Sequence, residues 1–275
     1  MFRSVLVPLD GSPFSEQALP LAQMVGRVSG TKLHLGHVHD GDGRDQKESY
    51  LEKLVESLKE AGVDADQTLM TGKVTKAIED WATRVKPDLI LMATHGRSGV
   101  ERLRLGSVAE VLVSRGLAPM LLLHASADGE SPAPGKFNHV VVALDQSSFA
   151  QSILEPLASL GKAAGVSAYT LVHVAENKGA GRAGWTPLAA VQARALENLD
   201  PIRARLQEPD VSVDVQVVMS ADPSAGILGV AEKVGADIIA MTTHGMTGVR
   251  PTLLGSVASK VLHDWHGPLL IHRPS

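Results

Sequence analysis

Glycine and serine recur in two stretches of the chain whose spacing suits phosphate binding. One stretch reads Thr94-His95-Gly96-Arg97-Ser98-Gly99 and, after six residues, reaches Gly106-Ser107. The other reads Thr243-His244-Gly245-Met246-Thr247-Gly248 and, after six residues, reaches Gly255-Ser256. Glycine lets the backbone turn and approach a ligand closely, and a helix N-terminus offers N–H donors and a favourable dipole. Each stretch therefore could cradle a phosphate, with Ser107 predicted to cap the helix that follows.

Two further loops carry an aspartate and a serine directly after a short apolar run. They read Pro8-Leu9-Asp10-Gly11-Ser12 and Ala143-Leu144-Asp145-Gln146-Ser147. The aspartate could bind a ribose hydroxyl, an adenine amine, or a metal ion carried by phosphates. A single Gly-x-x-Gly before a helix is more often an ordinary turn, but two such loops in each of two copies favour a ligand site.

The two sets of loops are not identical. Gln146 stands where the first copy has Gly11, so the second loop is expected to adopt positive φ less readily. Arg97 stands opposite Met246, which gives the first copy one more charge for phosphate. The first copy is therefore predicted to be the better site.

These loops lie at matching places in an internal repeat. Residues 2–30 align without a gap with residues 137–165, and residues 88–96 align with 237–245. Extra residues in the second copy fall around 177–187, and they include Trp185, which could contact a partner or cover the site. We expect one domain over residues 1–125, a linker rich in Pro, Gly and Ser over 126–136, and a second domain over 137–275.

Apolar runs alternate with helical periodicity throughout each copy. In the first copy, strands are expected at 5–9, 33–38, 65–70, 89–93 and 120–123, and helices at 15–28, 46–61, 75–85 and from 107. In the second copy, strands are expected near 140–144, 168–174, 211–218, 237–242 and 268–271. Strands that are almost uniformly apolar and alternate with helices predict an α/β fold with a parallel sheet covered on both faces. Ligands of such sheets bind beyond the carboxyl ends of the strands.

Composition narrows the class of protein. The chain has 275 residues, a formal net charge of −4, an estimated pI of 6.3 and no cysteine. The charge argues against a general nucleic-acid binder, and no apolar run reaches the roughly 20 residues that span a bilayer. Without cysteine, disulfides and thiolate metal sites are excluded. A cytoplasmic protein with neither nucleic acid nor membrane as partner is the simplest interpretation.

At these motifs the chain resembles the universal stress protein family in its tandem two-domain form. The family's ATP-binding signature is a Gly-x-x-Gly with Gly-Ser or Gly-Thr ten residues after the first glycine. Gly96, Gly99 and Gly106-Ser107 match it in the first copy, and Gly245, Gly248 and Gly255-Ser256 match it in the second. The resemblance covers almost the whole chain apart from the linker.

The resemblance implies two doubly wound five-stranded parallel sheets of order 3-2-1-4-5, of the adenine-nucleotide α-hydrolase type. It also implies ATP, or ADP or AMP, with Mg²⁺ helping. Adenine would lie near Val38 and Val174, and Asp10 and Asp145 beside the nucleoside. The residues assigned to ligand binding are Pro8, Leu9, Asp10, Ser12, Val38, Thr94, His95, Gly96, Arg97, Gly99, Gly106, Ser107 and Val108 in the first copy, and Ala143, Asp145, Ser147, Val174, Thr243, His244, Gly245, Gly248, Gly255, Ser256 and Val257 in the second.

Family members commonly dimerise by pairing their fifth strands. In this chain the two copies are expected to form that pseudo-dimer internally, through 119–124 and 268–272, and a homodimer of whole chains is also conceivable. Trp81 is expected in the core of the first copy.

Three kinds of function stay open. The first is a nucleotide-binding stress or regulatory protein with little or no turnover. The second is a slow ATPase or an ATP-using enzyme of a related α/β class, and the third is a scaffold that binds no ligand. A Walker-type loop is absent. His95 and His244 are interpreted as shaping the loops rather than as catalytic bases, and His37 and His39 on one strand face are not expected to bind a metal.

Overall fold

The structure is a computed structural model, and it describes residues 1–39, 41–94, 106–125, 137–175, 188–243 and 255–274. The first repeat contains β1 (Ser4–Leu9), α1 (Pro13–Glu16), α2 (Leu19–Gly26), β2 (Lys32–His39), α3 (Arg44–Glu60), β3 (Asp64–Thr71), α4 (Val74–Val85), β4 (Leu89–Thr94), α5 (Ser107–Arg115) and β5 (Met120–His124). The second contains β6 (His139–Ala143), α6 (Ser148–Gln151), α7 (Leu154–Ala164), β7 (Ala168–Ala175), α8 (Leu188–Leu206), β8 (Ser212–Met219), α9 (Pro223–Val234), β9 (Ile238–Thr242), α10 (Ser256–Asp264) and β10 (Leu269–His272).

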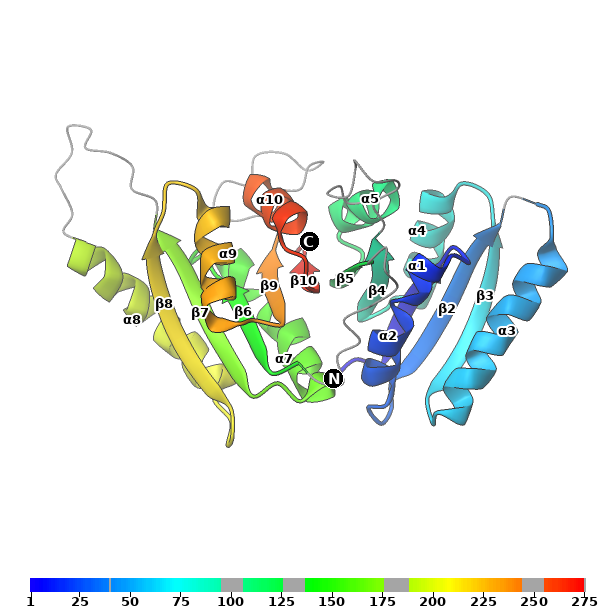
Figure 1. Ribbon diagram of the computed structural model, residues 1–275, viewed down its shortest axis with the longest axis horizontal. Coiled ribbons are helices and arrows are strands. Elements are labelled where there is room, and N and C mark those ends of the chain that lie inside the picture. The colour runs from blue at the N-terminus through cyan, green and yellow to red at the C-terminus, as the bar shows by residue number, and fades with distance from the viewer. Residues whose placement is uncertain (40, 95–105, 126–136, 176–187, 244–254, 275) are drawn as a thin grey trace.

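All ten strands form one sheet, in the order β3-β2-β1-β4-β5-β10-β9-β6-β7-β8. Each half has the predicted order 3-2-1-4-5 and is parallel within itself. The halves meet at β5 and β10, which pair antiparallel with Leu121 opposite Leu270. The pairing of fifth strands that was expected within the chain is therefore present. It makes a single sheet of the two five-stranded sheets, with β3 and β8 at its outer edges (Figure 1).

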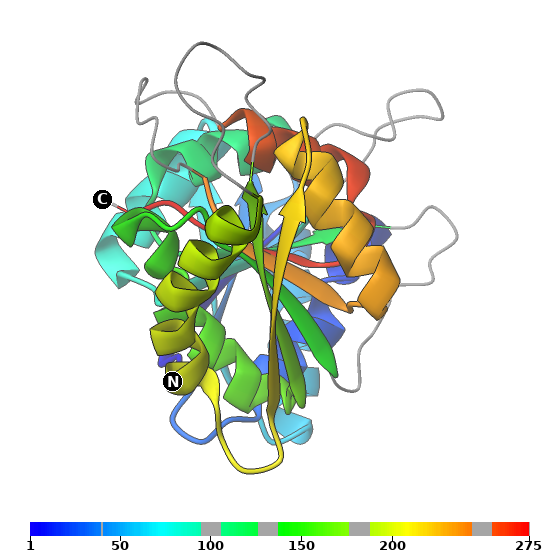
Figure 2. The same ribbon diagram turned by 90° about the vertical axis from the view of Figure 1, so that its left-hand side faces the viewer.

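Helices cover both faces of this sheet, which explains why its inner strands, such as β1 and β4, are apolar on both sides. Alternate residues of β1 show the division: Val5 and Val7 belong to the core under α2 and α3, and Leu6 belongs to the core under α4 and α5. The second half repeats this arrangement, and α8 and α9 lie on opposite faces of it (Figure 2). Two continuous apolar cores thus run along the sheet, one on each side.

Trp81 is buried in α4, as expected, with 1% of its surface exposed. It packs directly over Gly36 of β2: a Cβ atom on Gly36 would lie 2.3 Å from the indole ring atoms Cη2 and Cζ3. The absence of a side chain at Gly36 therefore lets α4 approach the sheet closely.

The helix expected over residues 15–28 is instead two helices, α1 and α2, so that prediction was wrong. Pro20 lies in the first turn of α2 and has no N–H to donate to the carbonyl four residues earlier. The same break separates α6 from α7, where Glu155 takes the place of Pro20. The proline is therefore compatible with the break, but the break does not require it.

None of the described helices is both long enough and apolar enough to cross a membrane.

Candidate functional site

A tight turn follows β1 and is held by Asp10. Its Oδ1 accepts hydrogen bonds from the Ser12 N–H at 2.9 Å and from the Ser12 hydroxyl at 2.6 Å. Ser12 in turn caps α1, because its Oγ accepts from the Ser15 N–H at 3.2 Å. Between them Gly11 has φ +79°, a left-handed conformation that glycine adopts at no steric cost. The Asp-x-Ser motif thus stabilises the conformation of this turn.

The second repeat builds the same turn after β6. Asp145 Oδ1 accepts from the Ser147 N–H at 3.0 Å and from its hydroxyl at 2.6 Å, and Ser147 Oγ caps α6 by accepting from the Ala150 N–H at 3.0 Å. Gln146 adopts φ +67°. Glutamine thus adopts the left-handed conformation that it was expected to enter less readily than glycine, and Asn198 of α8 donates a hydrogen bond at 2.8 Å to the Gln146 side chain.

In each repeat, a histidine near the end of the second strand forms a hydrogen bond with the residue before the aspartate. The Nδ1–H of His37 donates to the carbonyl of Leu9 at 3.0 Å, and that of His173 donates to the carbonyl of Leu144 at 2.9 Å. Burial is the main cause that lowers the pKa of His37, and the neighbouring Lys47 ammonium lowers it further. His37 is therefore neutral and structural. The sequence showed the matching His-Val pairs, but not this contact.

Gly106 and Gly255 begin the helices α5 and α10. Both have extended backbone angles and are the N-cap residues, so the prediction that Ser107 caps α5 was wrong. Ser107 and Ser256 are instead the first helical residues, and both are exposed. This leaves both hydroxyls at a helix N-terminus, where N–H groups and the helix dipole favour an anion.

Gly255 is packed more closely than Gly106. Its N–H donates to the carbonyl of the buried Thr243 at 3.0 Å, and a Cβ atom on it would lie 2.3 Å from that oxygen. No described atom lies within 4 Å of the corresponding position on Gly106. The two helix starts thus share a conformation but differ in their surroundings.

The valines assigned to the site lie on one face of the sheet. Val38, Val108, Val174 and Val257 are partly buried and pack against the core under α4, α5, α9 and α10. In the second repeat, α9 packs onto Val174, because a Cβ atom on Gly226 would lie 3.0 Å from a Val174 methyl group. The end of the second strand and the start of the last helix therefore border the same side of each half.

The remaining described candidates lie at strand ends. Pro8 and Leu9 end β1, Ala143 ends β6, and Thr94 ends β4 with its hydroxyl 3.4 Å from the Leu123 carbonyl. Since β1 lies between β2 and β4, and β6 between β7 and β9, the turn after the first strand and the end of the fourth strand are neighbours in each half. This is the topological switch point of the sheet. Seven candidates fall outside the described residues: His95, Gly96, Arg97, Gly99, His244, Gly245 and Gly248. Met246 and Trp185 also fall outside them.

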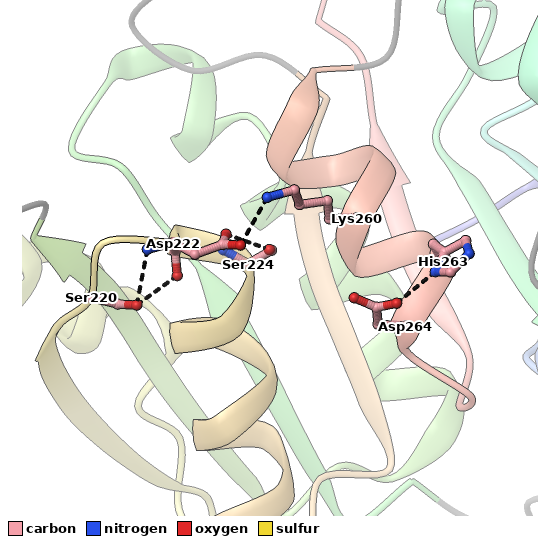
Figure 3. Close-up of polar contacts among 6 residues, drawn as sticks. All are labelled: Ser220, Asp222, Ser224, Lys260, His263 and Asp264. Carbon is pink, nitrogen blue, oxygen red and sulfur yellow. Dashed lines mark hydrogen bonds and ion pairs between the residues drawn. The ribbon is translucent and has the colours of Figure 1, made fainter.

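Charged residues that the sequence analysis did not select also lie at this edge. In the first repeat, the Lys47 ammonium of α3 approaches the turn after β1, 3.5 Å from where a Cβ atom on Gly11 would lie. In the second, Asp222 at the start of α9 forms an ion pair of 2.8 Å with Lys260 of α10 (Figure 3). Among the described residues, no group of three or more His, Cys, Asp or Glu side chains is arranged to hold a metal ion. A comparison of the repeats position by position would have exposed these charge differences.

Comparison with known proteins places both halves in one family. A profile of the universal stress protein family matches residues 1–124 and again residues 136–273. A universal stress protein of Mycobacterium tuberculosis (strain ATCC 25618 / H37Rv) is 30% identical over 193 residues, which are 68% of this chain and 62% of that protein. The chain therefore spans less than two thirds of that relative. One from Methanocaldococcus jannaschii is 26% identical over 140 residues, which are 45% of this chain and 82% of the relative.

Solved structures agree with the fold of the whole chain. The crystal structure of a putative universal stress protein from Pseudomonas aeruginosa UCBPP-PA14 has a TM-score of 0.76 at 17% identity, over 99% of this chain and 94% of that one. A universal stress protein from Archaeoglobus fulgidus DSM 4304 has a TM-score of 0.73 at 20% identity, over 99% of both chains. At such identities the likeness establishes the tandem α/β fold.

Proposed function

Since this chain belongs to the universal stress protein family and contains two copies of the family's domain, we propose that it binds adenine nucleotides at the carboxyl edge of each half-sheet. The observation that carries the proposal is that one arrangement occurs twice. In each half, an Asp-x-Ser turn follows the first strand, and an exposed serine begins a helix after the neighbouring fourth strand.

The roles within each site follow from chemistry. Val38 and Val174 offer apolar surface to adenine, and Asp10 and Asp145 lie beside the nucleoside. Phosphates bind the helix N-termini at Ser107 and Ser256 together with the glycine loops, because N–H groups and hydroxyls are the donors that phosphate needs. Mg²⁺ would be brought by the phosphates. The ligand would be ATP, ADP or AMP.

We further infer that the protein binds and responds to nucleotide rather than turning it over quickly. Backbone donors can supply micromolar affinity, about 8 kcal/mol. Fast hydrolysis requires in addition a positioned water and a charge clamp on the transferred phosphoryl group. His37 and His173, the histidines nearest the described turns, are each engaged with a backbone carbonyl. A regulatory role in the cytoplasm, with domains at 1–125 and 137–275, fits this proposal.

Calorimetric titration with ATP and Mg²⁺ tests the proposal on the wild type and on Gly106→Val/Ser107→Ala. The φ of −58° at Gly106 is accessible to valine, so the variant is expected to fold. We expect a tighter and a weaker binding event for the wild type, and the loss of the tighter one in the variant. A thermal unfolding curve serves as the control for folding.

Two results would contradict the proposal in different ways. Identical heats for the wild type and the variant would remove the first repeat as a site. Phosphate release at the rate of ordinary ATPases, about 1 per second or faster, would replace the binding protein by an enzyme. A mass spectrum of ligand that copurifies with the protein would identify the nucleotide directly.

A further inference from the structure

The two repeats present different charges at the start of their fourth helix. Asp222 is the N-cap of α9, and the equivalent N-cap of α4 is Lys73. Lys260 lies one turn into α10, where the equivalent position of α5 is Val111. The second repeat therefore has an acid where the first has a base, and a lysine where the first has none.

In the second repeat these two charges neutralise each other. Lys260 Nζ donates to Asp222 Oδ2 at 2.8 Å, while Asp222 Oδ1 accepts from the N–H and hydroxyl of Ser224 at 3.0 and 2.6 Å (Figure 3). The bond from Lys260 is the main cause that lowers the pKa of Asp222 to about 2, so the carboxylate is ionised at neutral pH. Both side chains are about half exposed, so Lys260 can turn to another anion.

The ion pair lies at the border of the nucleotide site proposed above. Asp222 stands four residues before Gly226, which packs against Val174, and Lys260 follows Ser256 by four residues on the same face of α10. The pair therefore joins the side assigned to adenine to the side assigned to phosphate. A ligand with several phosphate charges would compete with Asp222 for Lys260. It would also be repelled by the Asp222 carboxylate.

The first repeat has two lysines at the corresponding edge and one carboxylate, Glu110 in the first turn of α5, where the second repeat has Ser259. Lys73 is exposed at the start of α4. The Lys47 ammonium lies beside the turn after β1 and makes no hydrogen bond or ion pair within the described part of the chain. In the second repeat, that turn is contacted instead by the neutral Asn198 amide through Gln146. Both differences favour anions in the first repeat, whereas Glu110 at the start of α5 repels them.

We propose that the two repeats discriminate nucleotides by charge: the first selects polyphosphates, and the second, closed by the Asp222–Lys260 pair, selects adenosine or its monophosphate. This inference rests on the nucleotide binding proposed above. It assigns Asp222 a role in specificity, as a carboxylate that both repels phosphate and occupies the lysine that would bind it.

Asp222→Asn tests this in the full chain. Asparagine caps a helix as well as aspartate does, so the change removes the charge and keeps the cap. In the Gly106→Val/Ser107→Ala background, where only the second site remains, we expect the affinity for ATP to rise about fivefold to tenfold at low salt and the affinity for adenosine to stay within about twofold. The gain should shrink as salt is added.

Two further variants isolate the cause. Asp264→Asn removes a similarly exposed carboxylate from the far end of α10, where it contacts His263, and is expected to change neither affinity (Figure 3). Adding Lys260→Met to Asp222→Asn should remove most of the gain for ATP, since the released ammonium is lost.

The outcomes separate the two proposals. Adenosine binding with equal ATP affinities in Asp222→Asn and Asp264→Asn would overturn the selection by charge and leave nucleotide binding intact. An equal gain for adenosine and ATP would also overturn it, because the effect would not depend on phosphate charge. If neither ATP nor adenosine binds to the wild type, the proposed function fails and this inference fails with it.

Discussion

Gly106 and Gly255 occupy equivalent positions in the two repeats, but they differ in how closely other atoms approach them. Gly255 is pressed against the carbonyl of Thr243, whereas Gly106 has no described atom close to its missing side chain. Both have φ values that any residue can adopt, −56° and −58°. Glycine at 255 is therefore required by close approach, and not by conformational freedom.

We expect Gly255→Ala to lower the free energy of unfolding by about 1–3 kcal/mol, because the methyl group must displace the Thr243 backbone. The matched change Gly106→Ala should cost less than about 1 kcal/mol. Urea denaturation of both variants measures the difference. Equal destabilisation by the two changes would contradict this account of Gly255.

At the scale of elements, the position of α4 depends on the close packing of the Trp81 ring against Gly36, which has no side chain. The Trp81 ring lies where a side chain on Gly36 would be. Close packing leaves no room to absorb an added methyl group. The distance between α4 and the sheet is therefore set by this pair.

A double-mutant cycle tests the pair. Gly36→Ala should cost about 1–3 kcal/mol by overpacking, and Trp81→Phe should cost a similar amount by leaving a cavity. Because phenylalanine lacks the indole atoms that the new methyl would meet, the double variant should lose less than the sum of the two. Additive losses, measured from urea denaturation curves, would show that the residues are not coupled.

The elements themselves followed largely from the sequence. Apolar runs predicted the inner strands, because a sheet covered on both faces needs apolar residues on both sides, whereas the edge strands β3 and β8 contain more polar residues. The break between α1 and α2 was not predicted from the sequence, because the apolar spacing continues across it. Likewise, the contact between Asn198 and Gln146 could not be predicted, because Asn198 belongs to a helix distant in sequence.

At the scale of the whole molecule, the two halves are joined along β5 and β10. Leu121 and Leu270 face each other across this seam and are fully buried. His124, at the end of β5, contacts the second repeat near the Leu262 carbonyl, and His263 and His266 are its titratable neighbours. Its Nε2 is buried and has no hydrogen-bond partner among the described residues. Burial is the main cause that lowers the pKa of His124 below its usual value of 6.5.

Acid should therefore weaken the seam. The unfolded chain binds a proton at His124 near its usual pKa of 6.5, whereas the folded chain resists protonation to a lower pH. The contribution of His124 to stability is therefore full above pH 6.5. It declines as the pH falls from 6.5 towards the lower pKa of the folded state, by at most about 1.4 kcal/mol per pH unit for one histidine. We expect the melting temperature to fall between pH 7.5 and 5.5, and His124→Phe to make that fall shallower.

Burial also lowers the pKa of His37 and of His272, so part of the acid sensitivity should persist in His124→Phe. A pH profile that His124→Phe leaves unchanged would contradict a role for His124 in the seam.

The sequence by itself determined the duplication, the alternation of strands and helices, and the motifs that resemble universal stress proteins, because periodicity and local spacing are properties of neighbouring residues. Only the tertiary structure decided which contacts those motifs make. It showed Asp10 and Asp145 holding their own turns, Gly106 rather than Ser107 as a cap, and Asp222 paired with Lys260 in one repeat alone. Such contacts join residues far apart along the chain, so they depend on how elements pack, and the single sheet across both repeats depends on the same packing.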